Sequence, residues 1–276
     1  MVGTEKSRYA FFISDRTGIT SEGLGEALLN RFDYVDFQKR TYPFIDSIEK
    51  AETLVKQINK IVEDGHPRPL IFSSIVNTDI RETIHHCQGF HIDFFDTFIH
   101  LLEKELKEIA SNKVGKTHGV NDAEKYARRM DAVNFSLNHD DGLIHKNLKH
   151  ADIILVGVSR SGKTPTCLYL ALNYGIRAAN YPLIEDDLDK FNIPRLLAPY
   201  QDKLFGLTID PGRLHGIRTE RRPDSKYADL ENCEKEVIQA EKIFKYNKIP
   251  YISSTNKSVE ELAASVMAQT GLKRQF

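Results

Sequence analysis

The sequence has few cysteines, no long apolar segment and almost no net charge. Its three cysteines, Cys87, Cys167 and Cys233, are too few and too scattered for a disulfide framework or a zinc site, and they suit a reducing cytosol. No apolar run approaches the roughly 20 residues that cross a bilayer, and we expect no signal peptide. Lys plus Arg total 38 against 39 for Asp plus Glu, which gives no broad basic footprint for nucleic acid. We therefore expect a cytoplasmic protein that acts on neither membranes nor nucleic acid.

The length and composition suit a globular protein of one or two domains. The chain has 276 residues, of which 41% are hydrophobic and 28% are charged, and these values are ordinary for a soluble protein. A polar break, SNKVGKTHGVND, covers 111–122 and has the composition of a linker or a functional loop. We predict two α/β domains, an N-terminal one over 1–112 and a C-terminal one over 113–276.

Strand and helix patterns alternate through the N-terminal part. We expect strands over 8–14, 34–42 and 68–76, and helices over 21–32, 48–62, 79–87 and 93–110. The helix over 48–62 carries one apolar stripe, and Asp46 or Ser47 can cap it. A β-α-β-α-β order is typical of a parallel sheet with helices on both faces. The expected fold is a doubly wound, Rossmann-like domain.

The C-terminal part repeats this alternation around a glycine-rich segment. Strands are expected over 151–156, 175–183, 203–210 and 249–254, and helices over 123–137, 165–174, 232–246 and from 258 onward. Ser258 followed by Glu261 is the signature of a capping box on the last helix. The helix over 123–137 can pack on either domain. These elements predict a P-loop kinase-like domain.

The glycine-rich segment, GVSRSGKT, fits the phosphate-binding pattern G-x-x-x-x-G-K-[ST]. An apolar run precedes it and a helix follows it, with Pro165 suited to the first turn. Gly157 and Gly162 let the backbone turn tightly and aim successive N–H groups at one point. The alternative is a glycine-rich turn with a surface lysine, but the flanking strand and helix favour a phosphate site.

Side chains of this segment have expected roles as well. Lys163 would bridge the terminal phosphates of a nucleotide, and Thr164 would bind Mg²⁺. Arg160 lies inside the segment and is placed to contact phosphate. The residues expected to bind the nucleotide are Gly157, Val158, Ser159, Arg160, Ser161, Gly162, Lys163 and Thr164.

Acidic and basic side chains follow the predicted strand over 203–210. A second acidic residue in the position of Asp210 often holds Mg²⁺. The pair Asp-Pro is equally typical of a helix N-cap followed by proline. The sequence favours neither Mg²⁺ binding nor the N-cap over the other. Arginines beside a phosphate loop can neutralise a transferring phosphoryl group, whereas the alternative is a solvated helical face. The four arginines concerned are Arg213, Arg218, Arg221 and Arg222.

A His-Asp-Asp-Gly segment, residues 139–142, precedes the strand over 151–156. A histidine beside two carboxylates can act as a general base, and the carboxylates can bind metal. The alternative is a helix C-terminus followed by a turn that ends in Gly142. We take Asp141 and His139 as catalytic candidates, together with Lys163 and Arg160.

The first predicted strand leads into Asp15, within the sequence SDRTGIT. Ligands of open α/β sheets bind at the carboxyl ends of strands, and Thr17, Gly18 and Thr20 add hydroxyls and a flexible backbone there. A capped turn explains the same residues, and local physics slightly favours that alternative.

Seven segments in a fixed order make the chain resemble a known family. They are SDRTGITSEGLG, THGV, RRMDAVNFSLNHDDG, ILVGVSRSGKTPTCLYLA, ANYPL, KLFGLTIDPGRL and ISSTNKSVEELA. Together they closely resemble the phosphoenolpyruvate synthase regulatory proteins, whose family also includes the pyruvate, phosphate dikinase regulatory proteins. The resemblance covers nearly the whole chain and is nearer to the synthase branch. The chain departs from the family at Arg16, where a small residue is expected.

The resemblance implies a bifunctional enzyme. Members of the family use ADP to phosphorylate a threonine near the catalytic histidine of the target, which inactivates the target and releases AMP. They remove the same phosphate with inorganic phosphate and release diphosphate. The resemblance places ADP on Gly157 to Thr164 and implies phosphoenolpyruvate synthase as the protein partner.

Two other functions fit the residues alone. One is a P-loop kinase that phosphorylates a small molecule with ATP, although such an enzyme does not need an N-terminal domain of this size. The other is a non-catalytic sensor that binds a partner according to adenylate state. The sequence leaves open whether the chain forms a homo-oligomer, whether the synthase or the dikinase is the target, and which residue is the general base.

Overall fold

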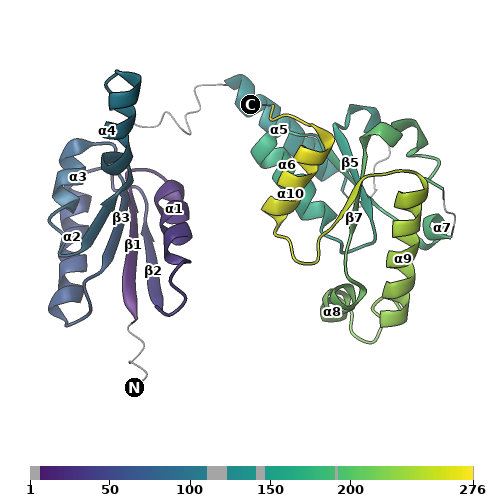
Figure 1. The fold of residues 1–276 in the computed structure, drawn as a ribbon, viewed down its shortest axis with the longest axis horizontal. Helices are drawn as coiled ribbons and strands as arrows, with labels where there is room; N and C mark the ends of the chain where they lie inside the picture. The colour runs from purple at the N-terminus through teal and green to yellow at the C-terminus, as the bar shows by residue number, and fades with distance from the viewer. Residues whose placement is uncertain (1–6, 111–122, 141–146, 190–191, 276) are drawn as a thin grey trace. The chain divides into compact units, whose positions relative to one another are not determined.

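Figure 1 shows the fold as a computed structural model, which describes residues 7–110, 123–140, 147–189 and 192–275. The chain divides into two compact units, residues 1–119 and 120–276. The predicted boundary between 112 and 113 lies outside the described residues and stays a prediction. None of the helices in the described ranges is long and apolar enough to cross a membrane.

The N-terminal unit is built on a parallel sheet with the strand order β2-β1-β3-β4, of which Figure 1 labels β1, β2 and β3. The sequence patterns do not predict β4, because its four residues are mostly exposed or half-buried and form no apolar run. The strands are β1 (Arg8–Ser14), β2 (Phe37–Tyr42), β3 (Leu70–Ser74) and β4 (Phe90–Asp93). The helices are α1 (Ile19–Leu29), α2 (Ile48–Glu63), α3 (Thr78–Ile84) and α4 (Phe94–Leu106).

Alternate residues of the central strands face opposite layers of helices. Phe11, Ile13 and Ile71 share a buried cluster with residues of α2 and α3. Phe12 and Phe72 share another with residues of α1 and α4. Successive side chains of a strand point to opposite faces, so strands that are apolar on both faces need helices on both. The predicted doubly wound sheet is confirmed.

The C-terminal unit contains a second parallel sheet, with the order β6-β5-β7-β8. Helix α5 packs on α6 and β6, so the helix that the sequence could place on either domain belongs to this unit. The strands are β5 (Ile153–Gly157), β6 (Ala178–Pro182), β7 (Leu204–Thr208) and β8 (Tyr251–Ser253). The helices are α5 (Ala123–Asn138), α6 (Lys163–Tyr174), α7 (Glu185–Leu188), α8 (Pro211–Arg221), α9 (Leu230–Tyr246) and α10 (Val259–Thr270), with 3₁₀ turns at Leu148–His150 and Ala198–Lys203.

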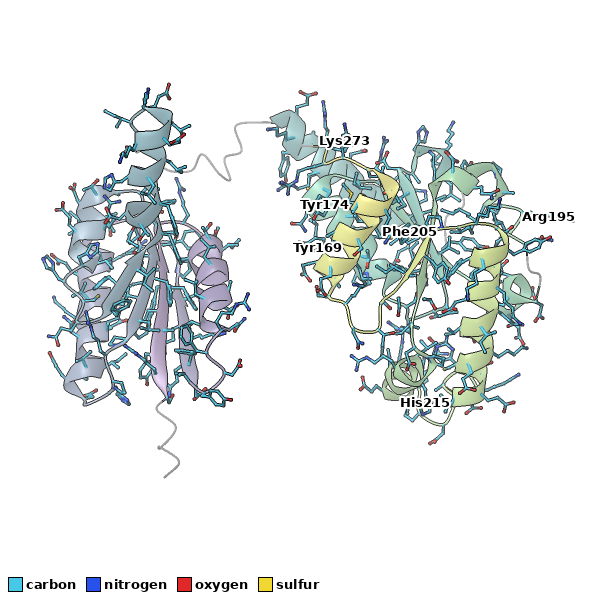
Figure 2. All side chains as sticks on the ribbon, viewed as in Figure 1. Tyr169, Tyr174, Arg195, Phe205, His215 and Lys273 are labelled. Carbon is cyan, nitrogen blue, oxygen red and sulfur yellow. The ribbon has the colours of Figure 1, made fainter. Side chains whose placement is uncertain are left out.

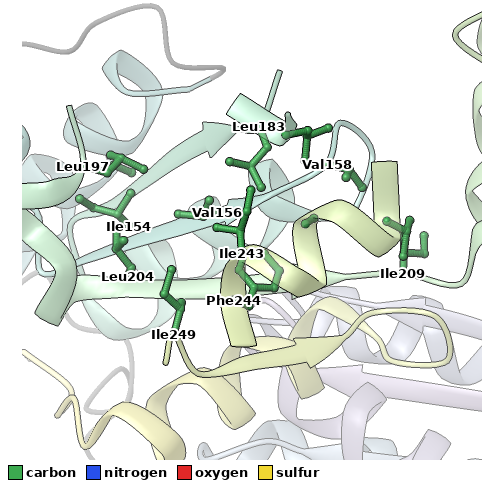
Figure 3. Close-up of a cluster of buried hydrophobic side chains, with 14 of the residues drawn as sticks. Ile154, Val156, Val158, Leu183, Leu197, Leu204, Ile209, Ile243, Phe244 and Ile249 are labelled. Atoms are coloured by element: carbon green, nitrogen blue, oxygen red, sulfur yellow. The ribbon is translucent and has the colours of Figure 1, made fainter. Parts of the chain in front are cut away.

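Strand β5 is also buried on both faces. Ile154 and Val156 belong to the same buried cluster as Ile243 and Phe244 of α9 (Figure 3). On the other face, the cluster around β5 combines residues of α6 and α10 with Phe205 of β7, which is labelled in Figure 2. The capping box predicted for the last helix is present, because the Ser258 side chain accepts from the N–H of Glu261 and the Glu261 side chain accepts from the N–H of Ser258. The predicted α/β architecture of the second domain is thus observed.

We predict that all three cysteines are unreactive in the folded protein. Each is at most 5% exposed. Burial raises the pKa of Cys87 to about 12 and also raises the pKa values of Cys167 and Cys233. Because the thiolate is the reactive form, a thiol reagent at pH 8 should label no cysteine in the native protein and all three in denaturant. Fast labelling of a native cysteine, followed by mass spectrometry, would contradict this assignment.

Candidate active site

The segment Gly157–Thr164, which we call the glycine loop, joins β5 to α6 in a tight turn. A Cβ atom at Gly157 would lie 2.2 Å from the carbonyl oxygen of Leu207, so β5 and β7 approach too closely for any other residue. Gly162 and Arg160 have φ values of 90° and 75°, in the left-handed region. The strand, loop and helix required by the sequence pattern are therefore all present.

The carbonyl groups of the loop are bound from the protein side. Val158 O accepts a hydrogen bond from Lys163 Nζ at 2.8 Å and one from the N–H of Ser161 at 3.3 Å. The C=O and N–H of a trans peptide point in opposite directions, so the N–H that follows a bound carbonyl is turned away from that contact. No side chain caps the N-terminus of α6, and such a terminus favours an anion.

A cavity of about 240 Å³ opens beside the glycine loop. Its walls include Lys163 and Thr164 from the loop side, Asn180 from β6, and Ile217 and Arg221 from α8. The cavity is thus lined from β6 and from the helix that follows β7, since the carboxyl ends of both strands lie at the same edge of the parallel sheet as the loop.

Polar groups gather around Thr164, one of the residues that line this cavity. The Thr164 hydroxyl donates to Asp140 Oδ1 at 2.8 Å. The Asn180 amide donates to the same Asp140 oxygen at 2.6 Å and to the Thr164 hydroxyl at 3.0 Å. Hydroxyl and carboxylate oxygens are the ligands that Mg²⁺ prefers, so Thr164 and Asp140 together suit this ion.

The two catalytic candidates that flank Asp140 have different outcomes. Asp141 lies outside the described residues. His139 is buried at the end of α5, where its ring stacks on Phe135 at 4.0 Å and its Nδ1 lies 2.8 Å from the Phe135 carbonyl oxygen. These contacts match the helix C-terminus that we considered as the alternative. A catalytic role for either residue stays a prediction.

The four arginines that follow β7 differ in exposure and in contacts. Arg221 is exposed and lines the cavity, where its charge can meet a phosphate. Arg218 is fully buried and binds Glu236 at 2.6 Å. Burial lowers the pKa of Arg218, but the hydrogen bond and charge of Glu236 outweigh this effect and raise it. Arg213 and Arg222 are exposed.

Asp210, the second candidate ligand for Mg²⁺, caps α8. Its Oδ1 atom accepts from the N–H of Arg213 at 2.9 Å, and Pro211 begins the helix. This is the N-cap geometry expected of an Asp-Pro pair. Across the described part of the chain, no group of three or more His, Cys, Asp or Glu side chains is placed to hold a metal ion. Metal binding by Asp210 stays a prediction.

The first loop of the N-terminal unit forms a structural turn. Asp15 is buried, and its Oδ2 accepts from the N–H of Val76 at 2.9 Å, which ties the end of β1 to the segment after β3. Gly18 precedes α1 with a φ of 81°. The Asp15 contact is long-range and no side chain caps the start of α1, so a ligand-binding role for this loop stays a prediction.

Comparison with known proteins decides the family. The sequence profile described as kinase/pyrophosphorylase matches residues 10–267. The chain belongs to the kinase/pyrophosphorylase family.

Similar proteins from several bacteria match almost the whole chain. A protein of Laribacter hongkongensis is 55% identical and one of Neisseria meningitidis is 53% identical, each over 98% of both chains. A third, from Marinobacter nauticus, is 53% identical over 97% of this chain and 98% of its own length. The names of all three designate them as phosphoenolpyruvate synthase regulatory proteins. The resemblance seen in the sequence segments is thus confirmed.

Two residues that hydrogen-bond the Thr164 hydroxyl, Asp140 and Asn180, are not singled out by the sequence. Asp140 is considered there only as one of two carboxylates that can bind metal, and Asn180 only as part of a strand. Asn180 could have been found, because it lies near the carboxyl end of a strand that follows the glycine loop and its helix. The choice between Asp140 and Asp141 depends on the turn after α5, which no periodic pattern reveals.

We predict that Gly157→Ala destabilises the C-terminal unit by about 3 kcal/mol or more, because the new methyl group would overlap a strand carbonyl. Gly216→Ala is the matched control, since a Cβ there meets nothing within 4 Å in an exposed stretch of α8. It should stabilise by about 0.5–1 kcal/mol through helix propensity. Urea denaturation measures both. Equal stability of the two variants would contradict the packing described.

Proposed function

We propose that this protein transfers the β-phosphoryl group of ADP to a threonine of phosphoenolpyruvate synthase, and removes that phosphate by phosphorolysis. Membership of the kinase/pyrophosphorylase family supports two reactions at phosphate groups. The names of the relatives support the synthase as the target.

One observation carries the proposal: the cavity places anion-binding and oxygen-rich groups side by side. Lys163 and Arg221 supply positive charge, the uncapped start of α6 supplies N–H groups, and Thr164 with Asp140 supplies oxygen ligands. A phosphoryl transfer enzyme works mainly by positioning and charge neutralisation. The same cavity suits ADP, diphosphate and phosphate, since all of them present phosphate oxygens.

In the kinase direction, the glycine loop holds the two phosphates of ADP. The threonine hydroxyl of the target attacks the β-phosphorus, the bond from that phosphorus to the bridging oxygen breaks, and AMP leaves as the hydroxyl proton is released. Lys163 and Arg221 would balance the negative charge that moves onto the bridging oxygen. Arg160, exposed at the tip of the loop, is placed to meet the incoming target.

In the phosphorylase direction, inorganic phosphate occupies the same anion site. One of its oxygens attacks the phosphorus of the phosphothreonine, the bond to the threonine oxygen breaks, and that oxygen takes up a proton. The products are diphosphate and the free threonine hydroxyl. A site that holds the diphosphate part of ADP is therefore suited to hold the diphosphate that is formed.

Magnesium fits this site through Thr164 and Asp140, whose oxygens lie 2.8 Å apart. Such an ion supplies charge neutralisation at the phosphate oxygens. Asp210 stays a further candidate ligand. The base that orients the threonine hydroxyl is sought among His139, Asp140 and Asp141.

The decisive assay mixes the purified protein with phosphoenolpyruvate synthase, Mg²⁺ and ADP labelled on its β-phosphate. The expected result is label on a threonine of the synthase and loss of synthase activity. Labelling from ATP of a small molecule would instead support the metabolite kinase. ADP binding with no transfer would support the non-catalytic sensor.

We predict that Lys163→Ala weakens ADP binding by about 100-fold, because a buried charge-assisted contact to phosphate is lost. Both activities should fall together if one site serves both. Lys273→Ala is the matched control, since Lys273 is exposed and distant in sequence (Figure 2). Calorimetric titration with ADP measures the affinity. Intact phosphorolysis in Lys163→Ala would show that the two reactions use separate sites.

We also predict that Asp140→Asn lowers the affinity of the site for Mg²⁺ in both reactions, because a neutral amide is a weaker ligand than a carboxylate. The concentration of Mg²⁺ that gives half-maximal transfer should rise about tenfold. Asp141→Asn and His139→Gln, assayed in parallel, identify the base by a fall in kcat at saturating Mg²⁺. An unchanged Mg²⁺ requirement in Asp140→Asn would remove this residue from the site.

A further inference from the structure

Arg218 is the largest fully buried side chain in the described part of the chain. Its guanidinium pairs with Glu236 of α9 at 2.6 Å, and its Cζ atom lies over the ring of Tyr227, 4.2 Å from the ring centroid. Burying such a pair gains little net stability over well-packed apolar side chains. The position of the arginine therefore calls for an explanation other than core stability.

The explanation lies in what Arg218 touches besides Glu236. Its Nη2 atom donates to the carbonyl oxygen of Ser159 in the glycine loop at 3.2 Å, and its Nη1 atom donates to the carbonyl of Tyr227 at 3.0 Å. The hydroxyl of Tyr227 lies 3.0 Å from the hydroxyl of Ser159. Both the backbone and the side chain of Ser159 are thus held from the protein side.

Holding the Ser159 carbonyl fixes the next N–H as well. The peptide between Ser159 and Arg160 is trans, so the N–H of Arg160 points away from Arg218. Arg160 itself has a φ of 75°, a left-handed conformation that costs energy for a residue with a side chain. Consecutive N–H groups in such a turn form an anion-binding concavity, and a contact that keeps this peptide in place maintains it.

The support for Arg218 comes from two helices. Arg218 lies in α8 and Glu236 in α9, and Ala228 lies in the turn between these helices. The ring of His215, labelled in Figure 2, lies 2.6 Å from the carbonyl oxygen of Ala228 through Nδ1. The turn that carries Tyr227 is thereby fixed to α8.

We propose that Arg218 is a positioning residue that holds the Ser159–Arg160 peptide so that the Arg160 N–H faces the diphosphate site. Glu236 orients the guanidinium through their ion pair, and the ring of Tyr227 packs against the guanidinium. The proposal deepens the proposed function, since it takes the diphosphate group of ADP or free diphosphate as the ligand. It predicts that these three residues control anion affinity without touching the ligand.

The test uses the full chain and three variants of graded severity. Tyr227→Phe removes one hydroxyl, Glu236→Gln removes the charge that orients the guanidinium, and Arg218→Lys keeps the charge but cannot reach both acceptors. Hydrogen exchange of the amides at 158–162 is measured without ligand, and calorimetry gives the affinity for inorganic diphosphate and for ADP. Thermal unfolding reports stability.

The expected result is faster exchange at 158–162 and weaker diphosphate binding in every variant. The loss of affinity should be about threefold for Tyr227→Phe and about tenfold or more for Glu236→Gln and Arg218→Lys, in line with losing a neutral and a charge-assisted hydrogen bond. In turnover, KM for ADP should rise more than kcat falls. Tyr246→Phe and Glu234→Gln, both exposed on α9, are matched controls that should change nothing.

Two outcomes would overturn the proposal. One is unchanged exchange at 158–162 in Glu236→Gln and Tyr227→Phe, and the other is a loss of thermal stability with no change in diphosphate affinity. Failure of the proposed function has a different signature: the wild-type protein would transfer no label to the synthase, while exchange and diphosphate binding would still respond to the variants as expected.

Discussion

The position of β5 between β6 and β7 determines which groups can meet at the glycine loop. In a parallel sheet, the loops that leave neighbouring strands all start at one edge, so the loop after β5 has Asn180 on one side and α8 on the other. The absence of a side chain at Gly157 lets β5 lie close to the Leu207 carbonyl of β7, the strand that precedes α8. The chemistry of the cavity follows from this strand order rather than from the loop alone.

The charges around the loop are divided between two tasks. Arg218 is neutralised by Glu236 and donates a hydrogen bond to the Ser159 carbonyl of the glycine loop, which holds the loop in place. Arg221 and Arg160 are exposed to solvent. The acidic partner of the loop, Asp140, comes from the turn after α5 and accepts a hydrogen bond from the Thr164 hydroxyl. Arg221 and Asp140 are therefore supplied by different elements, whereas Lys163 and Thr164 both come from the glycine loop.

Much of the fold could be predicted from the sequence, and the site only in part. Apolar strands such as Ile153–Gly157 and the striped helix Ile48–Glu63 are visible in their periodicity, because burial dictates both. The short strand Phe90–Asp93 was missed, since an edge position does not require an apolar run. The roles of Asp140, Asn180 and Arg218 depend on contacts between segments 16 to 59 residues apart, and no local pattern records such contacts. The four arginines look alike in the sequence, and only the packing of α8 on α9 separates them.

The hydrogen bond from Lys163 to the Val158 carbonyl has a consequence for selectivity among the small anions of a cell. An anion that binds the Lys163 ammonium group must displace the Val158 carbonyl oxygen, an acceptor that belongs to the same chain and is already desolvated. A singly charged ion such as chloride offers one weak acceptor and gains little from the exchange. A polyanion offers several oxygens to the lysine and to the loop amides at once. These contacts compensate for the lost hydrogen bond between Lys163 and the Val158 carbonyl. The loop's own carbonyl thus acts as a competitor that sets a threshold of ligand charge.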